Sequence, residues 1–401
     1  MTNALPLDGI KVIDFSQILA GPFCTMMLAD MGADVIKVEK PNGGDDTRRY
    51  GPPFIKGESA AFLTLNRNKR SMILDMKHED GLRIAKQMLS KADVMIHNFR
   101  PGVVDRMGLG YNEVHQLNPA LVYATVSGFG TTGPYAPKAG FDLIAQGMSG
   151  LMATNGFPDA PPAKVGVPIA DLNTGMFCAF GILTAYVNRL NTGEGQHVDA
   201  SLLESGIAYT LYESATYFAT NEVSGPLGSA HRMIAPYQAF ATQDGYINIG
   251  AANQNNWERM CRAVGREDLL EDQRFASNGE RMVHIDNLTP IMETTFKSET
   301  TAHWVEVLEG AGVPTGPIYK VDQVYADPHV QSRNMAVEVE HPIAGPIRNI
   351  GVPVKLSDTP GSVRHAAPVL GAHTDAVLAQ FGFSESDIAA FKESGAAGVP
   401  A

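Results

Sequence analysis

Asp171 is the residue whose type and position point most directly to chemistry, because it stands where a long apolar segment begins. It ends the stretch Val165-Gly-Val-Pro-Ile-Ala-Asp171, and residues 177–190 after it are almost free of charge and are predicted to be helical. A carboxylate at a helix start meets backbone N–H groups and the positive end of the helix dipole, so we expect it to stay ionised. Such a carboxylate, in a substrate cleft, can attack an acyl carbon and form an anhydride. The alternative is that Asp171 is only a helix cap.

Two more polar residues, Asp142 and Gln17, could share a cleft with this nucleophile. Asp142 lies in Gly140-Phe-Asp-Leu-Ile-Ala-Gln146, and two carboxylates in one cleft could divide the roles of nucleophile and helper. Gln17 follows the first predicted strand, at the end where ligands bind in open α/β sheets. Asp142 is also consistent with a helix cap and Gln17 with a buried turn amide.

The turn that holds Gln17 reads Ser16-Gln-Ile-Leu-Ala-Gly-Pro22 and lacks the GxGxxG pattern. A backbone cradle for pyrophosphate needs those glycines, so the sequence disfavours a nicotinamide dinucleotide site.

Basic residues gather near the ends of predicted strands in the first half of the chain. They are Lys69, Arg70, Lys77, Arg100, Arg106 and Lys138. Because Arg and Lys pair well with phosphate, this grouping in an acidic protein favours a phosphorylated ligand. The segment Asn98-Phe-Arg-Pro-Gly102 adds an aromatic surface for a base next to a strand end. The alternative is a set of solvated surface charges.

Composition narrows the class of protein further. A formal net charge of −12 argues against general nucleic-acid binding. Three separated cysteines without Cys/His ligand spacing predict neither a metal site nor a disulfide framework. Residues 1–8 lack signal-peptide features, and the longest apolar run, 176–187, is too short to span a bilayer, so we expect a cytoplasmic protein without membrane contact. Ser201 and Ser205 lack a GxSxG elbow, which leaves serine hydrolase chemistry without support.

Strands and helices alternate through the first half of the chain, which predicts βαβ units and a parallel sheet. The expected strands are 10–15, 34–39, 71–76, 93–99, 121–126 and 196–201, and the expected helices are 21–31, 81–92, 112–117 and 171–191. A Gly/Ser/Pro stretch at 221–230 marks a linker, and 231–325 is predicted to be α+β. We therefore expect a large α/β domain over 1–220, a small α+β domain with linkers over 221–330, and a return segment over 331–401 that completes the large domain. Residues 250–253 could form a mobile lid or an ordinary strand-to-helix turn.

The chain resembles the class III CoA-transferases from Leu7 to about Phe381. The matching segments are 7–15, Ala20-Gly-Pro22, Gly32-Ala-Asp-Val-Ile-Lys-Val-Glu39, Asn68-Lys-Arg-Ser71, 98–102, Gly312-Val-Pro-Thr-Gly-Pro-Ile318 and Leu370-Gly-Ala-His-Thr374. The resemblance implies a Rossmann-like parallel-sheet domain with a smaller α+β domain, in an interlocked homodimer.

The resemblance also implies functional residues and a reaction. The family's catalytic aspartate falls on Asp171, and its CoA contacts fall on Gln17, Leu74, Lys77, Asn98, Phe99, Arg106 and Lys138. Asp171 would pass through an aspartyl–acyl anhydride and an aspartyl-CoA thioester. CoA would be a substrate, with acyl-CoA and a carboxylic acid as partners and no further cofactor. Backbone N–H groups at the start of the Asp171 helix would stabilise the developing oxyanions.

Residues 229–238 look closest to the succinyl-CoA-dependent dicarboxylate branch of this family, in which Arg232 could clamp a distal carboxylate. Two other functions stay open. One is a 2-methylacyl-CoA racemase, although that branch carries a His-Asp pair where this chain has Phe141-Asp142, so one of its two bases is missing. The other is a non-catalytic CoA-binding scaffold.

Overall fold

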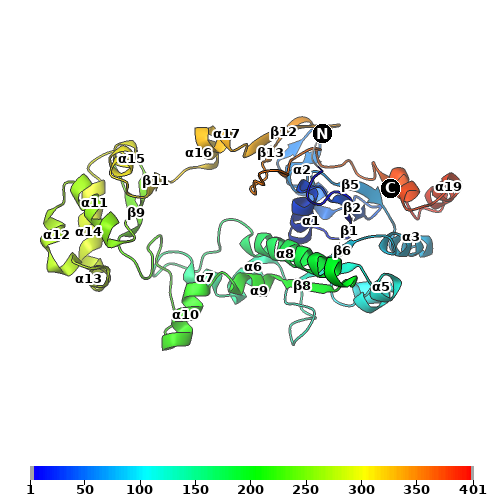
Figure 1. Cartoon of the computed structure of the whole chain (residues 1–401), viewed down its shortest axis with the longest axis horizontal. Helices are drawn as coiled ribbons and strands as arrows, with labels where there is room; N and C mark the ends of the chain where they lie inside the picture. The colour runs from blue at the N-terminus through cyan, green and yellow to red at the C-terminus, as the bar shows by residue number, and fades with distance from the viewer. Residues whose placement is uncertain (1–3, 399–401) are drawn as a thin grey trace. The chain divides into compact units, whose positions relative to one another are not determined.

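The computed structural model describes residues 4–398 and separates the chain into two compact units (Figure 1). The larger unit holds the chain up to Met152, Lys164–Glu222, and the chain from Pro328 onward. The smaller unit holds Ala153–Ala163 and Val223–Asp327. Residues 153–163, which the sequence groups with the large domain, thus belong to the smaller unit, where the Gly228 N–H donates to the Gly156 carbonyl at 2.7 Å.

Six parallel strands form the main sheet of the larger unit, in the order β5-β2-β1-β6-β7-β8. They are β1 (Lys11–Asp14), β2 (Asp34–Glu39), β5 (Arg70–Ile73), β6 (Val94–His97), β7 (Val122–Ser127) and β8 (His197–Ser201). Ranked by their position along the chain, these strands lie in the order 3-2-1-4-5-6, which is that of dinucleotide-binding folds. The predicted α/β class with a Rossmann-like parallel sheet is confirmed.

Alternation of side chains along each strand gives this sheet two apolar cores. Ile13, Ile36 and Met95 belong to one core, whereas the preceding residues Val12, Val35 and Val94 belong to the other. The first core is covered by α3 (Glu79–Leu89), α4 (Val103–Arg106), α5 (Tyr111–Leu117), α18 (Thr374–Gln380) and α19 (Glu385–Glu393). The second is covered by α1 (Ala20–Asp30), α6 (Asp142–Met148) and α8 (Ile169–Thr192). Helices therefore pack on both faces of the sheet.

Helices α1 and α8 pack closely and run in the same direction. A Cβ atom on Gly175 would lie 2.7 Å from the Ala20 carbonyl oxygen, so only glycine allows this approach near the two helix starts. Farther along, Leu28 of α1 and Ile182 of α8 line the same small cavity. Because α1 directly follows β1, both helices begin at the edge of the sheet where the strands end.

The C-terminal return segment is fastened to the larger unit by polar contacts. The Asn68 side-chain oxygen accepts from the backbone N–H groups of Arg364 at 2.7 Å and His365 at 2.9 Å. Near the end of the described chain, Ala397 pairs with Leu74 just beyond β5. The other strands and α-helices of this unit are β3 (Phe54–Ile55), β4 (Glu58–Ser59), α2 (Ala60–Leu65), α9 (Leu202–Ile207), α10 (Leu211–Thr220), α17 (Pro328–Ser332), β12 (Ala336–His341) and β13 (Gly345–Ile350). Helix α7 (Leu151–Thr154) crosses the first boundary between the units.

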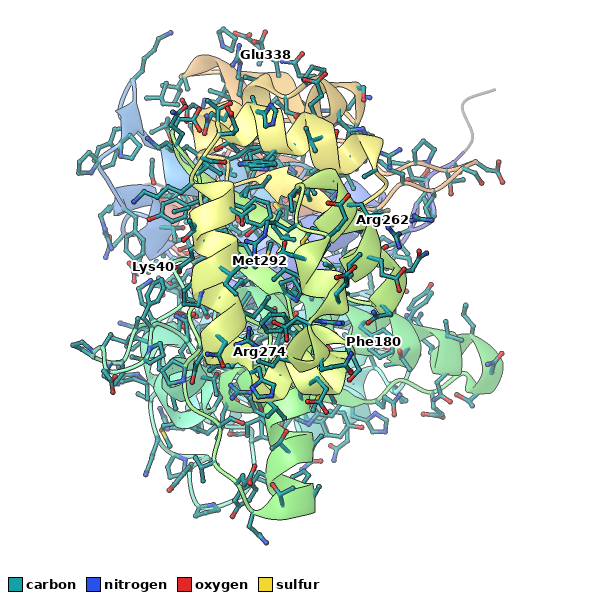
Figure 2. The ribbon with its side chains drawn as sticks, turned by 90° about the vertical axis from the view of Figure 1, so that its left-hand side faces the viewer. Lys40, Phe180, Arg262, Arg274, Met292 and Glu338 are labelled. Atoms are coloured by element: carbon teal, nitrogen blue, oxygen red, sulfur yellow. The ribbon has the colours of Figure 1, made fainter. Side chains whose placement is uncertain are left out.

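The smaller unit is α+β and has its own core. Its three-stranded antiparallel sheet consists of β9 (Tyr237–Ala241), β10 (Tyr246–Gly250) and β11 (Thr315–Pro317). Its α-helices are α11 (Gln254–Ala263), α12 (Asp268–Glu271), α13 (Asn278–Val283), α14 (Ile285–Phe296), α15 (Thr301–Gly310) and α16 (Val321–Ala326). Met292 is buried among these helices, whereas Arg262 and Arg274 lie at their surface (Figure 2). None of the helices within residues 4–398 combines the length and the apolar character that a bilayer span requires.

Candidate active site

The candidate site lies at the carboxyl edge of the main sheet, between β1 and β6, where the strand order reverses. The chain leaves β1 toward α1 on one face and leaves β6 toward α4 on the other. Open sheets of this kind bind ligands in the crevice that such a reversal forms. Gln17 follows β1 and Asn98 follows β6. The Gln17 N–H donates to Asn98 Oδ1 at 2.8 Å, and Asn98 Nδ2 donates to the Gln17 carbonyl at 2.7 Å. The structure thus brings together two predicted site residues that are far apart in sequence.

Phe99, the next residue after Asn98, is half-buried at the same edge and is held by His97. Its N–H donates to His97 Nδ1 at 3.3 Å, and the two rings stack with centroids 5.8 Å apart. Burial, with a smaller contribution from His197, lowers the pKa of His97 to about 3, so the imidazole is neutral. Since Nδ1 accepts, Nε2 carries the proton and donates to the Tyr123 hydroxyl at 3.0 Å. These contacts fix the aromatic surface that the sequence assigns to a base.

Asp171 lies in the first turn of α8, and Asp142 lies directly beside it. The helix begins at Ile169 after Pro168, so Asp171 is not the N-cap. Instead, Asp142 Oδ1 accepts from the backbone N–H of Ala170 at 2.9 Å and of Asp171 at 3.4 Å. The two predicted carboxylates do meet, and Asp142 caps the helix that carries Asp171.

The electrostatic setting of Asp171 differs from the sequence-based expectation. Burial, followed by the negative charge of Asp142, raises the pKa of Asp171 to about 7. Within the described part of the chain, no ion pair or hydrogen bond stabilises its carboxylate. The expectation that the helix terminus keeps Asp171 fully ionised is therefore wrong, because desolvation and the like charge of Asp142 outweigh the favourable helix dipole. Near neutral pH, part of the protein population therefore carries a protonated Asp171 and part carries the carboxylate.

The backbone N–H groups at the start of α8 are already engaged. The Ile169 N–H donates to the Val167 carbonyl at 2.8 Å and the Leu172 N–H to the Pro168 carbonyl at 3.0 Å. Asp142 accepts from the N–H groups of Ala170 and Asp171, which lie between them. Each of these amides already has an acceptor, so they do not provide the oxyanion stabilisation that the sequence led us to expect.

Sequence reasoning missed Gln146, which holds Asp142 in place. Gln146 is completely buried, and its Nε2 donates to Asp142 Oδ2 at 2.7 Å while its Oε1 accepts from the Val165 N–H at 2.9 Å. Both oxygens of Asp142 are therefore engaged. The available signal was the spacing of four residues between Asp142 and Gln146 in α6, at which an amide and a carboxylate face each other on a helix.

The basic residues predicted to meet a phosphorylated ligand fall into two groups. Lys77 follows β5, Arg100 follows β6, Arg106 ends α4, and Lys138 lies on the loop after β7, and all four are exposed at the carboxyl edge of the sheet. The Lys138 loop is closed at its base, where a Cβ on Gly128 would lie 2.7 Å from the Gly140 Cα.

Lys69 and Arg70 belong to the other group and do not fit a ligand site. Lys69 is buried, and its Nζ donates to the Pro22 carbonyl and to Asn66 Oδ1, both at 2.9 Å. Arg70 makes a two-pronged contact with the Asp34 carboxylate at 2.9 and 2.7 Å. Their charges are used within the fold, so the predicted basic cluster is smaller than the sequence indicates.

Leu74 also differs from its expected role. Its side chain is completely buried in the first core, and its N–H donates to the Glu39 carbonyl at 2.9 Å. Any contact of Leu74 with a ligand must therefore come from its backbone.

Two features of the smaller unit bear on expected substrate contacts. Residues 250–253 form the strand-to-helix turn: Ala251 is buried, and the Asn253 side chain caps α11 by accepting from the Asn256 N–H at 2.8 Å. Arg232 donates from Nη2 to the Gly225 carbonyl at 2.7 Å, and its role in substrate binding stays a prediction.

In the described ranges of both units, no group of three or more His, Cys, Asp or Glu side chains could hold a metal ion.

Comparisons with known proteins identify relatives along nearly the whole chain. The model of CoA-transferase family III matches residues 7–374. Human succinyl-CoA:glutarate CoA-transferase is 38% identical over 378 residues, covering 94% of this chain and 86% of the human protein. The succinate–glutarate CoA-transferase of Agrobacterium fabrum is 39% identical over 381 residues, covering 94% of this chain and 95% of that protein. A crystal structure of a CAIB/BAIF family protein from Brucella suis has a TM-score of 0.85 at 38% identity, covering 94% of this chain and 100% of that one.

Proposed function

The chain belongs to CoA-transferase family III, and on this premise we propose that Asp171 carries CoA from succinyl-CoA or a similar donor to a dicarboxylic acid acceptor. The observation that carries the proposal is the placement of Asp171. Its half-buried carboxylate, without a cationic partner among residues 4–398, lies at the sheet edge where this fold binds ligands. A carboxylate that is poorly solvated and not neutralised is a better nucleophile than one held in an ion pair.

The reaction balances with Asp171 as the only covalent group. A carboxylate oxygen attacks the thioester carbonyl carbon of the donor, the C–S bond breaks, and CoA thiolate leaves an aspartyl–acyl anhydride. The thiolate then attacks the aspartyl carbonyl carbon and expels the donor acid, which gives an aspartyl-CoA thioester. The acceptor carboxylate repeats these two steps in reverse, so free Asp171 and a new acyl-CoA are formed without net proton transfer.

Gln17 is proposed to assist each of these attacks. Every step places negative charge on a carbonyl oxygen, and a donor aimed at that oxygen stabilises the transition state. With the first amides of α8 already bonded, the Gln17 side-chain amide at the same edge is the donor that we assign to this task.

CoA is proposed to lie across the strand ends on either side of the crevice. Phe99 would stack on the adenine, while Lys77, Arg106 and Lys138 would pair with phosphates and Asn98 and the Leu74 backbone would add polar contacts. Exposure of the three cations at the sheet edge supports this assignment. No cofactor beyond CoA is needed by the steps above.

A dicarboxylate acceptor is proposed because the human and Agrobacterium fabrum relatives are both glutarate CoA-transferases. Arg232 remains the proposed clamp for the distal carboxylate, and the cytoplasm remains the expected compartment.

We also propose a homodimer, interlocked as the family resemblance implies. The support is an apolar row along α8 that is exposed in the single chain and consists of Met176, Phe177, Phe180, Leu183, Val187 and Leu190. Phe180 is 71% exposed and Leu190 is 69% exposed, which is more than a water-facing helix of a monomer usually shows. A solution mass of one chain by light scattering at assay concentration would contradict the dimer.

The racemase alternative is less well supported by the same geometry. A racemase needs two groups free to exchange protons at the α-carbon. Asp142 uses one oxygen to cap α8 and the other to accept from Gln146, and the residue before it is Phe141 rather than a histidine.

The deciding experiment is chemical trapping. Hydroxylamine added during turnover with an acyl-CoA donor should convert the aspartyl thioester into a hydroxamate on the peptide that contains Asp171, and intact-mass and peptide mapping would detect it. Free CoA without an acyl group should give no adduct, because a thiolate does not displace oxide from a free carboxylate. Transfer between donor and acceptor with that peptide unmodified at all quench times would contradict the aspartyl route. A panel of donors and acids, read by mass spectrometry, would identify the substrates.

A further inference from the structure

The side chain of Asn98 forms hydrogen bonds with both polar groups of the Gln17 backbone. Asn98 accepts from the Gln17 N–H at 2.8 Å and donates to the Gln17 carbonyl at 2.7 Å, although 81 positions separate the two residues. The side-chain amide of Asn98 thus replaces a neighbouring strand at the point where β1 and β6 have ended. Among the described residues, the carboxamide of Gln17 itself makes no hydrogen bond.

The next residue, Ile18, is held in an unfavourable backbone conformation. Its φ is 72°, in the left-handed region that a β-branched residue rarely adopts. Such strain persists only where the surroundings over-determine the conformation, and it is concentrated at functional sites.

A buried ion pair supplies the remaining restraints on this loop. Lys37 and Asp45 are fully buried, with Nζ 2.7 Å from Asp45 Oδ2. Lys37 Nζ also donates to the Ser16 carbonyl at 2.9 Å, and Asp45 Oδ1 accepts from the Ile18 N–H at 3.2 Å. The residues on both sides of Gln17 are therefore tied to one ion pair, whose separation would leave a buried charge without a partner.

We propose that Asn98 is a positioning residue for Gln17. Together with the Lys37–Asp45 pair, it holds the strained loop 16–18 so that the Gln17 carboxamide is presented to the crevice between β1 and β6. Asn98 thereby contributes to catalysis through Gln17, in addition to any contact of its own with CoA. The kinetic part of this proposal rests on the proposed function, whereas the structural part does not.

The structural part is tested by hydrogen–deuterium exchange on the full chain without substrate. In Asn98→Ala, the amides of residues 17–19 should exchange faster than in the wild type, because the Gln17 N–H has lost its acceptor. The exchange of α13 in the smaller unit should stay unchanged and serves as the internal control. Unchanged exchange at residues 17–19 would contradict the proposal that Asn98 holds the Gln17 backbone in place.

The kinetic part is tested by a double-mutant cycle between Asn98→Ala and Gln17→Ala, with succinyl-CoA and glutarate as substrates. Loss of the two hydrogen bonds should lower kcat by about tenfold in the wild-type background. In the Gln17→Ala background the same substitution should change kcat by less than about twofold, because residues that act as a unit are not additive. An equal fall in both backgrounds would show that Asn98 acts on the ligand directly and would overturn the positioning role.

Two further measurements separate positioning from CoA binding and from misfolding. The Kd for CoA, measured by calorimetry in the Gln17→Ala background, isolates any direct contact of Asn98 with CoA, because the Gln17 side chain is absent there. Asn98→Asp keeps the acceptor for the Gln17 N–H and loses the donor to its carbonyl, so its kcat should lie between those of the wild type and Asn98→Ala. If exchange at residues 17–19 becomes faster but no Asn98 variant changes kcat, then Asn98 holds the Gln17 backbone but Gln17 has no catalytic role. This outcome would also overturn the proposal.

Discussion

Asp142 caps the helix that carries Asp171, and it does so from 29 residues upstream, with Oδ1 2.9 Å from the Ala170 nitrogen and 3.4 Å from the Asp171 nitrogen. This contact anchors the start of α8, and it also places a negative charge against the proposed nucleophile. The second effect helps to raise the pKa of Asp171 to about 7, after the larger effect of burial. Asp142 therefore both anchors the helix that carries Asp171 and contributes to the raised pKa of Asp171.

The pH dependence of transfer should follow the ionisation of Asp171. Only the carboxylate attacks a thioester, so kcat/KM should fall with decreasing pH on a limb centred near pH 7, where the pKa of Asp171 lies. One pH unit below the pKa, about a tenth of the enzyme is ionised, so activity should drop about tenfold per unit on that limb. Initial rates with saturating acceptor and limiting succinyl-CoA, from pH 5 to pH 9, give this profile. Constant kcat/KM between pH 5 and pH 8 would contradict it.

Asp171→Asn should abolish transfer and also change the pH dependence of stability. The pKa of Asp171 is raised from 3.8 to about 7 in the folded chain, so the folded state binds the proton more tightly than the unfolded state. The free energy of unfolding contributed by this group therefore falls as pH rises from about 4 to about 7, and stays low above that range. Since Asn cannot ionise, the variant should equal the wild type near pH 4 and be more stable at pH 8. Urea unfolding at both pH values checks this, and a variant that is less stable at pH 8 would contradict it.

Two substitutions of Asp142 separate its charge from its capping role. Asp142→Asn keeps an oxygen for the Ala170 N–H but removes the charge, whereas Asp142→Ala removes both. Each should move the acidic limb of kcat/KM to lower pH, because the pKa of Asp171 loses its electrostatic contribution while burial remains. Only the alanine variant should lose the cap, at a cost of about 0.5–2 kcal/mol in the free energy of unfolding. A limb that stays near pH 7 in both variants would show that Asp142 does not control Asp171.

Much of the larger unit could be predicted from sequence, because local patterns determine it. The expected strand 34–39 matches β2 residue for residue, and the expected helix 171–191 is extended by only two residues before its start and one after its end in α8. Alternation of apolar strands with helices was sufficient to indicate a parallel sheet, and parallel strands place their following loops at one edge. Gln17, Lys77 and Asn98 each follow a predicted strand, so the sequence indicates that all three lie at strand ends.

What could not be predicted depends on contacts between residues far apart in the chain. The helix start at Ile169 follows from a cap supplied by Asp142, not from the residues before the helix. Lys69 and Arg70 look like ligand cations in sequence, but Lys69 donates to the Pro22 carbonyl, 47 positions away, and Arg70 donates to Asp34, 36 positions away. Helix α10 was missed because its apolar residues follow no buried face: Leu211 and Phe218 are 70% and 82% exposed.

Lys69 and Arg70 are bonded within the fold, whereas Lys77 and Arg106 are exposed at the sheet edge, and this difference predicts which substitutions weaken CoA binding. Lys77→Ala and Arg106→Ala should each raise the Kd for CoA by about tenfold or more, because a charge-assisted hydrogen bond contributes about 1.5–3 kcal/mol. Arg262→Ala is the matched control, since Arg262 is an exposed arginine of the smaller unit that pairs with Glu258 at 3.3 Å, and its removal should leave the Kd unchanged. Calorimetry with CoA and with dephospho-CoA assigns the residue that meets the 3′-phosphate, because that variant loses less affinity for the dephosphorylated ligand. If neither Lys77→Ala nor Arg106→Ala weakens CoA binding, CoA does not cross this edge of the sheet, and the proposed site must lie elsewhere.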